Sequence, residues 1–124
     1  MKLFTLLAVA FLLSGSVLLA CPPETTAKIT FDLAQISSDG LIGPPDGRRS
    51  LDYEFCIPTG EAYQLQVQTI DPSLKFYPGG RGRVGCTTQQ TLCIGNTHQA
   101  KWRAILLEIA RLPYVQRIDQ TVWE

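Results

Sequence analysis

The sequence predicts an α+β domain in which helices cover one face of a single antiparallel sheet. Residues 51–57 alternate apolar and polar side chains, as a half-buried strand does, and apolar residues between 102 and 112 recur at helical spacing. The order of the elements after residue 50 reads strand, helix, strand, strand, helix, strand. This order is the βαββαβ unit of a ferredoxin-like sandwich.

An additional strand is expected ahead of that unit, at residues 28–36, where Ile29, Phe31 and Leu33 alternate with polar residues. This strand would extend the sheet or cross its open face. Residues 37–50 follow with three glycines and two prolines, which indicates a long loop. Loops of this length in a compact domain tend to be functional or disordered. The candidate binding residues of this loop are Asp39, Asp46, Arg48 and Arg49.

The strand at 51–57 has one clearly apolar face. That face carries Leu51, Tyr53, Phe55 and Ile57. Cys56 points to the opposite face, because successive side chains of a strand alternate. Cys56 is therefore a candidate for covalent pairing or for a second, half-covered face.

Residues 60–71 allow two interpretations. As a strand, the segment would place Tyr63, Leu65 and Val67 on one face. As a helix, it would align Tyr63 with Val67 and Ile70. We predict the helix, because glutamine is a good helix former and β-branched residues are few. If the segment were a strand, the fold would be an antiparallel meander with one packed helix.

Residues 73–77 predict a short strand, which a glycine-rich turn follows at 78–83. Arg81 and Arg83 lie in this turn. Arginines on a glycine-rich backbone can bind an anion, so both are candidate binding residues. A solvated turn is the simpler interpretation, since no helix start or phosphate motif follows.

Two cysteines flank the segment 86–93, CTTQQTLC. A two-residue turn at 89–90 would place Cys86 opposite Cys93, within the reach of a disulfide. We predict this disulfide, which would stabilise the domain by about 2.5 kcal/mol. Cys56 is the alternative partner for either cysteine. With His98, the three cysteines could form a zinc set, but the spacing lacks the tight Cys-x2–4-Cys of structural zinc sites, so we predict no metal and no cofactor.

The predicted second helix begins after Asn96, which can serve as its N-cap, and ends at Leu112 before a proline. His98 would lie in the first turn. A Cys93–His98 nucleophile pair would make the protein an enzyme, but the sequence offers it no evident orienting group or oxyanion site. We therefore predict no catalytic activity. A final strand is expected over 114–123.

The first twenty residues have the pattern of an export signal, since Lys2 precedes an uncharged run that reaches Ala20. The run ends in Leu18-Leu19-Ala20-Cys21, which resembles the lipobox of bacterial lipoproteins. In that family the cysteine is acylated and the chain is cut just before it. The resemblance implies a lipid on Cys21 and attachment to a membrane on its periplasmic or cell-surface side. Cleavage after Ala20 without a lipid is the alternative.

These features divide the chain into a signal peptide (1–20), a tether (21–27) and one α+β domain (28–124). Lys2 is one of eleven basic residues, so the remaining chain carries ten basic and eleven acidic groups. A net charge near −1 gives no electrostatic basis for binding nucleic acid.

The predicted function is that of a membrane-tethered cell-envelope lipoprotein with a small non-catalytic binding or scaffolding domain. Its partner would be an envelope protein or ligand. One alternative is a peptidase-inhibitor-like module, because the ending helix-Leu-Pro-Tyr-Val-strand is similar to the close of small ferredoxin-like inhibitor and propeptide domains. The other is a thiol- or zinc-dependent protein. That alternative would use Cys56, Cys86, Cys93 and His98.

Overall fold

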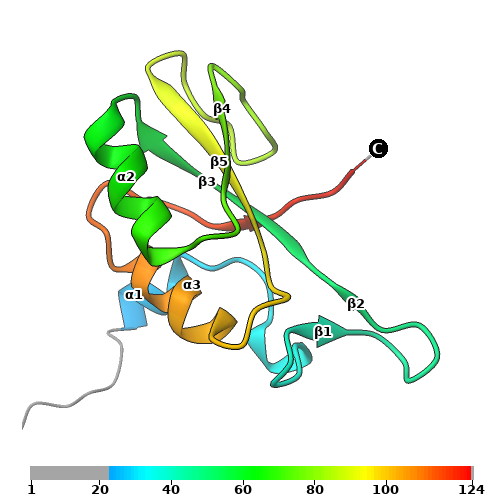
Figure 1. Ribbon diagram of the computed structural model, residues 1–124. Coiled ribbons are helices and arrows are strands. Elements are labelled where there is room, and N and C mark those ends of the chain that lie inside the picture. Colours follow the sequence, from blue (N-terminus) through cyan, green and yellow to red (C-terminus); the bar gives the residue numbers. More distant parts are fainter. Residues whose placement is uncertain (1–22, 124) are drawn as a thin grey trace, which may run out of the picture.

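The computed structural model describes residues 23–123, and its centre is a four-stranded antiparallel sheet (Figure 1). The strand order is β4-β5-β3-β6. The strands are β3 (Asp52–Pro58), β4 (Lys75–Pro78), β5 (Gln90–Asn96) and β6 (Asp119–Gln120). Helix α2 (Glu61–Ile70) joins β3 to β4, and α3 (Trp102–Ala110) joins β5 to β6. This connectivity confirms the predicted α+β fold with its βαββαβ unit.

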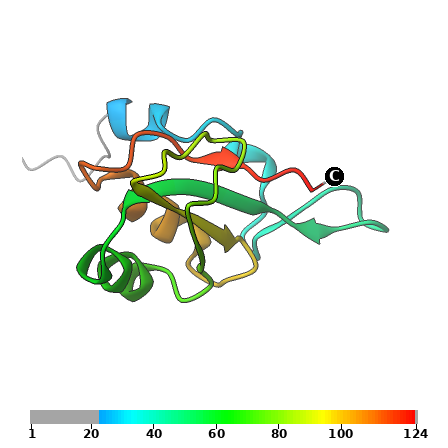
Figure 2. The ribbon, with the colours of Figure 1, turned by 90° about the horizontal axis from the view of Figure 1, so that it is seen from above.

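Helices α2 and α3 pack on the same face of the sheet (Figure 2). The buried side chains of β3 meet Val67 of α2 and the apolar stripe of α3 in one core cluster. The fully buried members from β3 and α3 are Tyr53, Phe55, Ile57, Leu106, Ile109 and Ala110. The two helices therefore cover the face that the alternation of β3 predicts to be apolar.

The predicted helix at 60–71 is confirmed, and its N-terminal cap is Gly60 rather than a polar side chain. Gly60 has φ of 152°, a backbone conformation that residues other than glycine rarely adopt. The hydroxyl of Thr59 instead lies 3.4 Å from that of Thr91. At the other end, the N–H of Asp71 donates to the carbonyl of Val67 at 2.8 Å. Pro72 then prevents continuation of the helix.

The pairing of β3 with β5 requires a glycine at one position. Gly95 lies opposite Tyr53 in the register, and the tyrosine ring packs over it. A Cβ atom at residue 95 would lie 2.6 Å from two ring carbons. Gly95 thus gives the buried ring the space above β5 that a larger residue would fill.

The second helix begins later than the sequence predicts. Strand β5 continues to Asn96, whose Oδ1 accepts the N–H of His98 at 2.8 Å. Asn96 therefore stabilises a turn after the strand and does not cap the helix, which starts at Trp102. Thr97, which follows Asn96, is buried, and its hydroxyl donates to the carbonyl of Gly40 at 2.7 Å.

The predicted strand at 28–36 is wrong. Ile29 forms a single parallel bridge with Ile118, and a 3-10 helix, η1 (Leu33–Gln35), follows. Asp32 causes the change, since its side chain accepts the N–H of Ala34 at 2.9 Å and caps this turn. The structure thus replaces the expected extra strand by one bridge and a helical turn.

Part of the expected tether is helical. It forms α1 (Pro23–Ala27), which contacts α3. The predicted strand at 114–123 is likewise reduced to β6. Strand β6 pairs with β3 at Tyr53 and Glu54, and just beyond it the N–H of Thr121 donates to the carbonyl of Asp52 at 2.8 Å. No helix within residues 23–123 is long and apolar enough to span a bilayer.

Residues 41–50 form an arm that projects from the sheet. Strands β1 (Leu41–Ile42) and β2 (Arg49–Ser50) pair as a two-stranded hairpin, and β2 leads directly into β3. A turn closes the tip, where the N–H of Gly47 donates to the carbonyl of Pro44 at 2.9 Å. The arm and helix α1 lie at opposite ends of the molecule in both views (Figures 1 and 2).

Candidate binding groove

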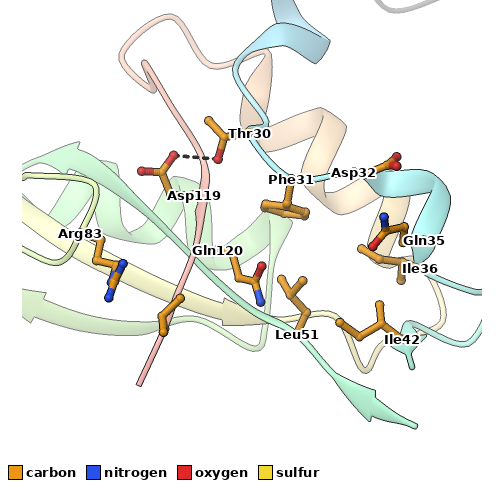
Figure 3. Close-up of a pocket in the computed structure, with 11 residues that line it drawn as sticks. Thr30, Phe31, Asp32, Gln35, Ile36, Ile42, Leu51, Arg83, Asp119 and Gln120 are labelled. Carbon is orange, nitrogen blue, oxygen red and sulfur yellow. Dashed lines mark hydrogen bonds between the residues drawn. The ribbon is translucent and has the colours of Figure 1, made fainter. Parts of the chain in front are cut away.

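A groove of about 540 Å³ opens at the base of the arm (Figure 3). Three segments surround it: residues 30–36, the arm with the start of β3, and β6 with the chain that follows. A single residue of the glycine-rich turn, Arg83, also reaches it. The lining residues are Thr30, Phe31, Asp32, Gln35, Ile36, Ile42, Leu51, Arg83, Asp119, Gln120 and Val122.

The groove has an apolar floor that continues the core of the domain. Ile36 and Leu51 are each 5% exposed and belong to the core cluster, while Phe31 and Ile42 pack against it and are half-buried. Val122 is 49% exposed at the open side. The core is therefore partly uncovered between the 30–36 segment and the arm.

The wall formed by β6 carries backbone groups that have no partner among residues 23–123. On its outer side, the N–H of Ile118 donates to the carbonyl of Lys28 at 2.8 Å, and the N–H of Thr30 donates to the carbonyl of Ile118 at 3.0 Å. Two residues later, the N–H and C=O of Gln120 point to the same side, because strand backbones alternate. Within residues 23–123, no backbone hydrogen bond reaches Gln120 on this side.

The polar rim near β6 is internally satisfied. Asp119 accepts the hydroxyl of Thr30 at 2.9 Å (Figure 3) and forms an ion pair with Arg117 at 3.0 Å. The charge of Asp119 is therefore balanced. Asp32 lies exposed at the other side of the groove. Within residues 23–123, its side chain interacts only with one backbone N–H, that of Ala34.

The structure brings two of the four predicted loop residues together. Arg48 forms an ion pair with Asp39 at 2.8 Å, and both groups hydrogen-bond to the hydroxyl of Ser37. The hydrogen bond from Ser37, followed by the interaction with Arg48, holds the pKa of Asp39 below its usual value. This pair links the residues that precede β1 to the residue that precedes β2.

The other two predicted loop residues lie apart from that pair. Asp46 is exposed in the turn at the tip of the arm. Arg49 lies opposite Ile42 in the register of the arm. Because directly opposed residues of an antiparallel pair face the same side, Arg49 shares its face with a residue that lines the groove.

The predicted pair Arg81 and Arg83 lies on a loop that covers the outer face of the sheet (Figure 2). We call residues 79–89 the strap. The strap is curled at one point, where the carbonyl of Arg81 accepts the N–H groups of Gly85 and Cys86 at 3.1 and 2.8 Å. Arg83 reaches the groove, whereas Arg81 does not line it. The two arginines therefore do not form one anion site.

The disulfide joins Cys56 to Cys86, with 5.5 Å between their Cα atoms. The predicted Cys86–Cys93 pairing is wrong, and the alternative partner Cys56 is confirmed. Residues 86–93 do not form a hairpin, because β5 starts at Gln90 and pairs with β3 and β4. Cys93 lies opposite Phe55 on the core face, whereas Cys56 lies on the outer face beneath the strap.

Two further contacts hold the strap against the sheet, and both involve Val84. Its N–H donates to the carboxylate of Glu54 at 3.0 Å, and its carbonyl accepts the guanidinium of Arg117 at 2.9 Å. Glu54 is only 2% exposed. This role of Glu54 was not predicted, although a charged residue between apolar neighbours in β3 is a visible signal in the sequence.

The thiol or zinc interpretation finds no site among the residues that the structure describes. The thiol of Cys93 is buried in the core, and this burial raises its pKa to about 12, so it is protonated and unreactive near neutral pH. His98 is exposed after β5. Residues 23–123 contain no cluster of three or more potential metal ligands from His, Cys, Asp or Glu.

A buried polar cluster was also missed from the sequence. Asp71 is fully buried at the end of α2 and accepts hydrogen bonds from the hydroxyls of Tyr53 and Ser73 and from the amide of Gln99. Burial, together with the carboxylate of Asp71, raises the pKa of Tyr53. These hydrogen bonds join the end of α2 to the turn before α3. No lining residue of the groove belongs to this cluster.

Comparison of the chain with protein-family models, with curated proteins and with solved structures gives no match. The candidate function therefore depends on the geometry of the arm and the groove.

Proposed function

We propose that the protein is an exported, lipid-tethered domain that binds a partner protein of the cell envelope and performs no catalysis. The tether is inferred from the sequence, in which the Leu18–Cys21 segment resembles a lipobox. Cys21 lies outside the described residues. The single observation that carries the binding role is the arm, which projects from the end of the domain opposite to α1 (Figure 1).

The position of the arm suits a tethered binding domain. The described chain starts at α1, so a lipid on Cys21 would attach the molecule at that end. The arm would then point away from the membrane surface. Rigid scaffolds commonly present recognition loops in this manner. The ion pair of Asp39 with Arg48 and the turn at Pro44–Gly47 give the arm a defined shape.

The absence of catalysis is proposed on chemical grounds. A nucleophile needs an accessible group with a base within hydrogen-bond reach. Cys93 is buried and its pKa is raised to about 12, and His98 is exposed elsewhere. The buried Asp71 interacts with Tyr53, Ser73 and Gln99, away from the groove.

Intact-mass analysis of the protein from its native membrane tests the tether. We expect a mass equal to residues 21–124 with a diacylglyceryl group and one disulfide. The matched control is Cys21→Ser, which should remain unprocessed and lack the lipid. A wild-type mass equal to unmodified residues 1–124 would refute the lipid tether.

Site-specific photo-crosslinking in intact cells tests the binding role. A photoreactive residue at Asp46, in the tip of the arm, should give one discrete adduct with a second protein. The control position is Leu65, which is 56% exposed on α2, away from the arm. Equal adducts from both positions, or none from the arm, would argue against the arm as the binding element.

The peptidase-inhibitor-like module is a second candidate, favoured by the confirmed βαββαβ order of the fold. Fold similarity alone is weak support for a function. A panel of serine, cysteine, aspartic and metallo-peptidases tests it with the purified protein. Inhibition at stoichiometric concentration would favour this candidate, and no inhibition of any class would remove it.

A further inference from the structure

We propose that the groove accepts an extended peptide segment of the partner protein, which adds as a strand to the free edge of β6 at Gln120. This inference deepens the proposed function, on which it rests. It names the conformation that the partner adopts and the charges that the partner carries. Strand addition of this kind obtains affinity from backbone hydrogen bonds and specificity from pockets for alternate side chains.

Residues 28–30 of the chain already occupy one part of the edge of β6. The carbonyl of Lys28 and the N–H of Thr30 pair with Ile118, in the parallel bridge formed by Ile29. The segment then turns into η1 and leaves the edge. The next outward pair of backbone groups, at Gln120, therefore remains available in the groove. A guest strand would continue a ladder that residues 28–30 begin.

The apolar floor of the groove determines the side-chain pattern of the guest. A guest strand alternates its side chains between two sides, so every second residue would face the floor. Phe31 and Ile42 are half-buried there, and Val122 is 49% exposed. Apolar residues at alternate positions of the guest would cover these side chains. The opposite side of the guest would face solvent and can be polar.

Charge complementarity defines the ends of the guest. The negative charge of Asp119 is balanced by Arg117, and Arg48 is balanced by Asp39. Arg49 is exposed on the groove-facing side of the arm and forms no ion pair within the described chain. We therefore expect an acidic residue in the part of the guest that lies beside the arm.

Asp32 supplies the complementary expectation at the other side of the groove. It is exposed, and its carboxylate accepts a backbone N–H without an ion pair to a described residue. A basic residue of the guest beside η1 would balance it. The guest is thus an extended peptide with alternating apolar residues, an acidic residue near Arg49 and a basic residue near Asp32.

Selection from a random twelve-residue phage-display library tests the proposal, with the full chain in detergent micelles as the target. The probes are the selected peptides, resynthesised with blocked ends. Gln120→Pro removes the outward N–H and should weaken their binding at least tenfold. Because this N–H makes no bond to β3, the sheet should tolerate the proline. Gln120→Ala is the matched control, and it should leave the affinity within twofold of the wild-type value.

A second variant keeps the test decisive if Gln120→Pro does not fold, which urea denaturation would reveal. Arg49→Glu should weaken peptides that carry an acidic residue at least fivefold. Replacing that acidic residue by lysine should restore binding to this variant. Methylation of alternate peptide amides should abolish binding to the wild-type chain, because an extended guest needs these N–H groups.

Several results would overturn the proposal: no selected peptide binds, N-methylated peptides bind unchanged, or Gln120→Pro binds as well as Gln120→Ala. Sedimentation of the full chain as a dimer that Gln120→Pro dissociates would assign the edge to a second copy instead. If the arm still captures a partner by photo-crosslinking after any of these results, the proposed function survives and only the strand-addition inference fails.

Discussion

Removal of the Cys56–Cys86 disulfide is the most informative perturbation of the fold. The bridge spans a sequence separation of 30 residues. On the chain-entropy relation, a closed loop of this length stabilises the domain by about 3.6 kcal/mol at 25 °C. We expect the double variant Cys56→Ala/Cys86→Ala to lose about this free energy of unfolding.

Urea denaturation followed by tryptophan fluorescence measures the effect, and Cys93→Ala is the matched control. Because Cys93 forms no bridge, its replacement should remove only a buried thiol, which costs about 1 kcal/mol. If Cys93 were bonded to Cys86, the same change would cost about 2.5 kcal/mol more from the lost eight-residue ring. The two assignments therefore differ by more than the error of the method.

Peptide mapping without reductant provides an independent measurement. Cys86 and Cys93 share one tryptic peptide, residues 84–101, so a second cut by chymotrypsin after Leu92 is needed to separate them. The structure predicts a linked pair that contains Cys56 and Cys86. A linked pair that contains Cys93, or a Cys93→Ala variant as unstable as the double variant, would refute the reasoning from the register.

Three further predictions concern the packing, the strap and the pH dependence of stability. Gly95→Ala should destabilise the domain by about 2–3 kcal/mol in urea, since the new Cβ meets a buried ring, whereas Gly47→Ala should change stability by less than about 0.5 kcal/mol. Glu54→Ala should cost about 1–3 kcal/mol and speed amide exchange at Val84, while Glu54→Gln, which keeps an acceptor oxygen, should cost less; equal effects of the two would contradict the assigned hydrogen bond. Because burial raises the pKa of Cys93 from 9.0 to about 12, the folded state keeps a proton that the unfolded state loses, so the free energy of unfolding should fall between pH 9 and 12 by up to about 1.4 kcal/mol per pH unit. Cys93→Ala should reduce this slope, and an unchanged slope would show that the thiol is not its source.

The part of the fold that follows from local periodicity could be predicted from the sequence. The alternation in β3 and the helical spacing in α3 each identify one element and its buried face. The choice of helix for α2 depended on its glutamines and on its small number of β-branched residues, which are also local signals. The order of these elements was then sufficient for the βαββαβ fold.

The errors arose where a contact distant in sequence decides the structure. The segment at 28–36 alternates like a strand, but it meets the sheet only through the bridge of Ile29 to the distant Ile118, and the local cap of Asp32 then turns the chain. The partner of Cys86 depends on which face of β5 points to the core, and the register with β3 determines that face. An isolated hairpin of residues 86–93 would lack the pairing with β3 that sets this register.

The candidate groove was only partly predictable. The length and composition of the 37–50 loop indicated a recognition element, and the structure shows a projecting arm there. The groove itself unites residues 30–36, the arm and β6, which are far apart in the sequence. The unpaired backbone of Gln120 leaves no trace in residue types, so only the three-dimensional arrangement reveals it.

The opposite orientation of Cys93 and Cys56 has a consequence for oxidative folding. In an unfolded chain, these two thiols and Cys86 can combine in three ways. Once β3 and β5 align, the sheet separates Cys93 from the other two, and a single combination remains. Pairing of the strands therefore selects the Cys56–Cys86 disulfide. An oxidant that acts after this pairing gives the correct product without an isomerase.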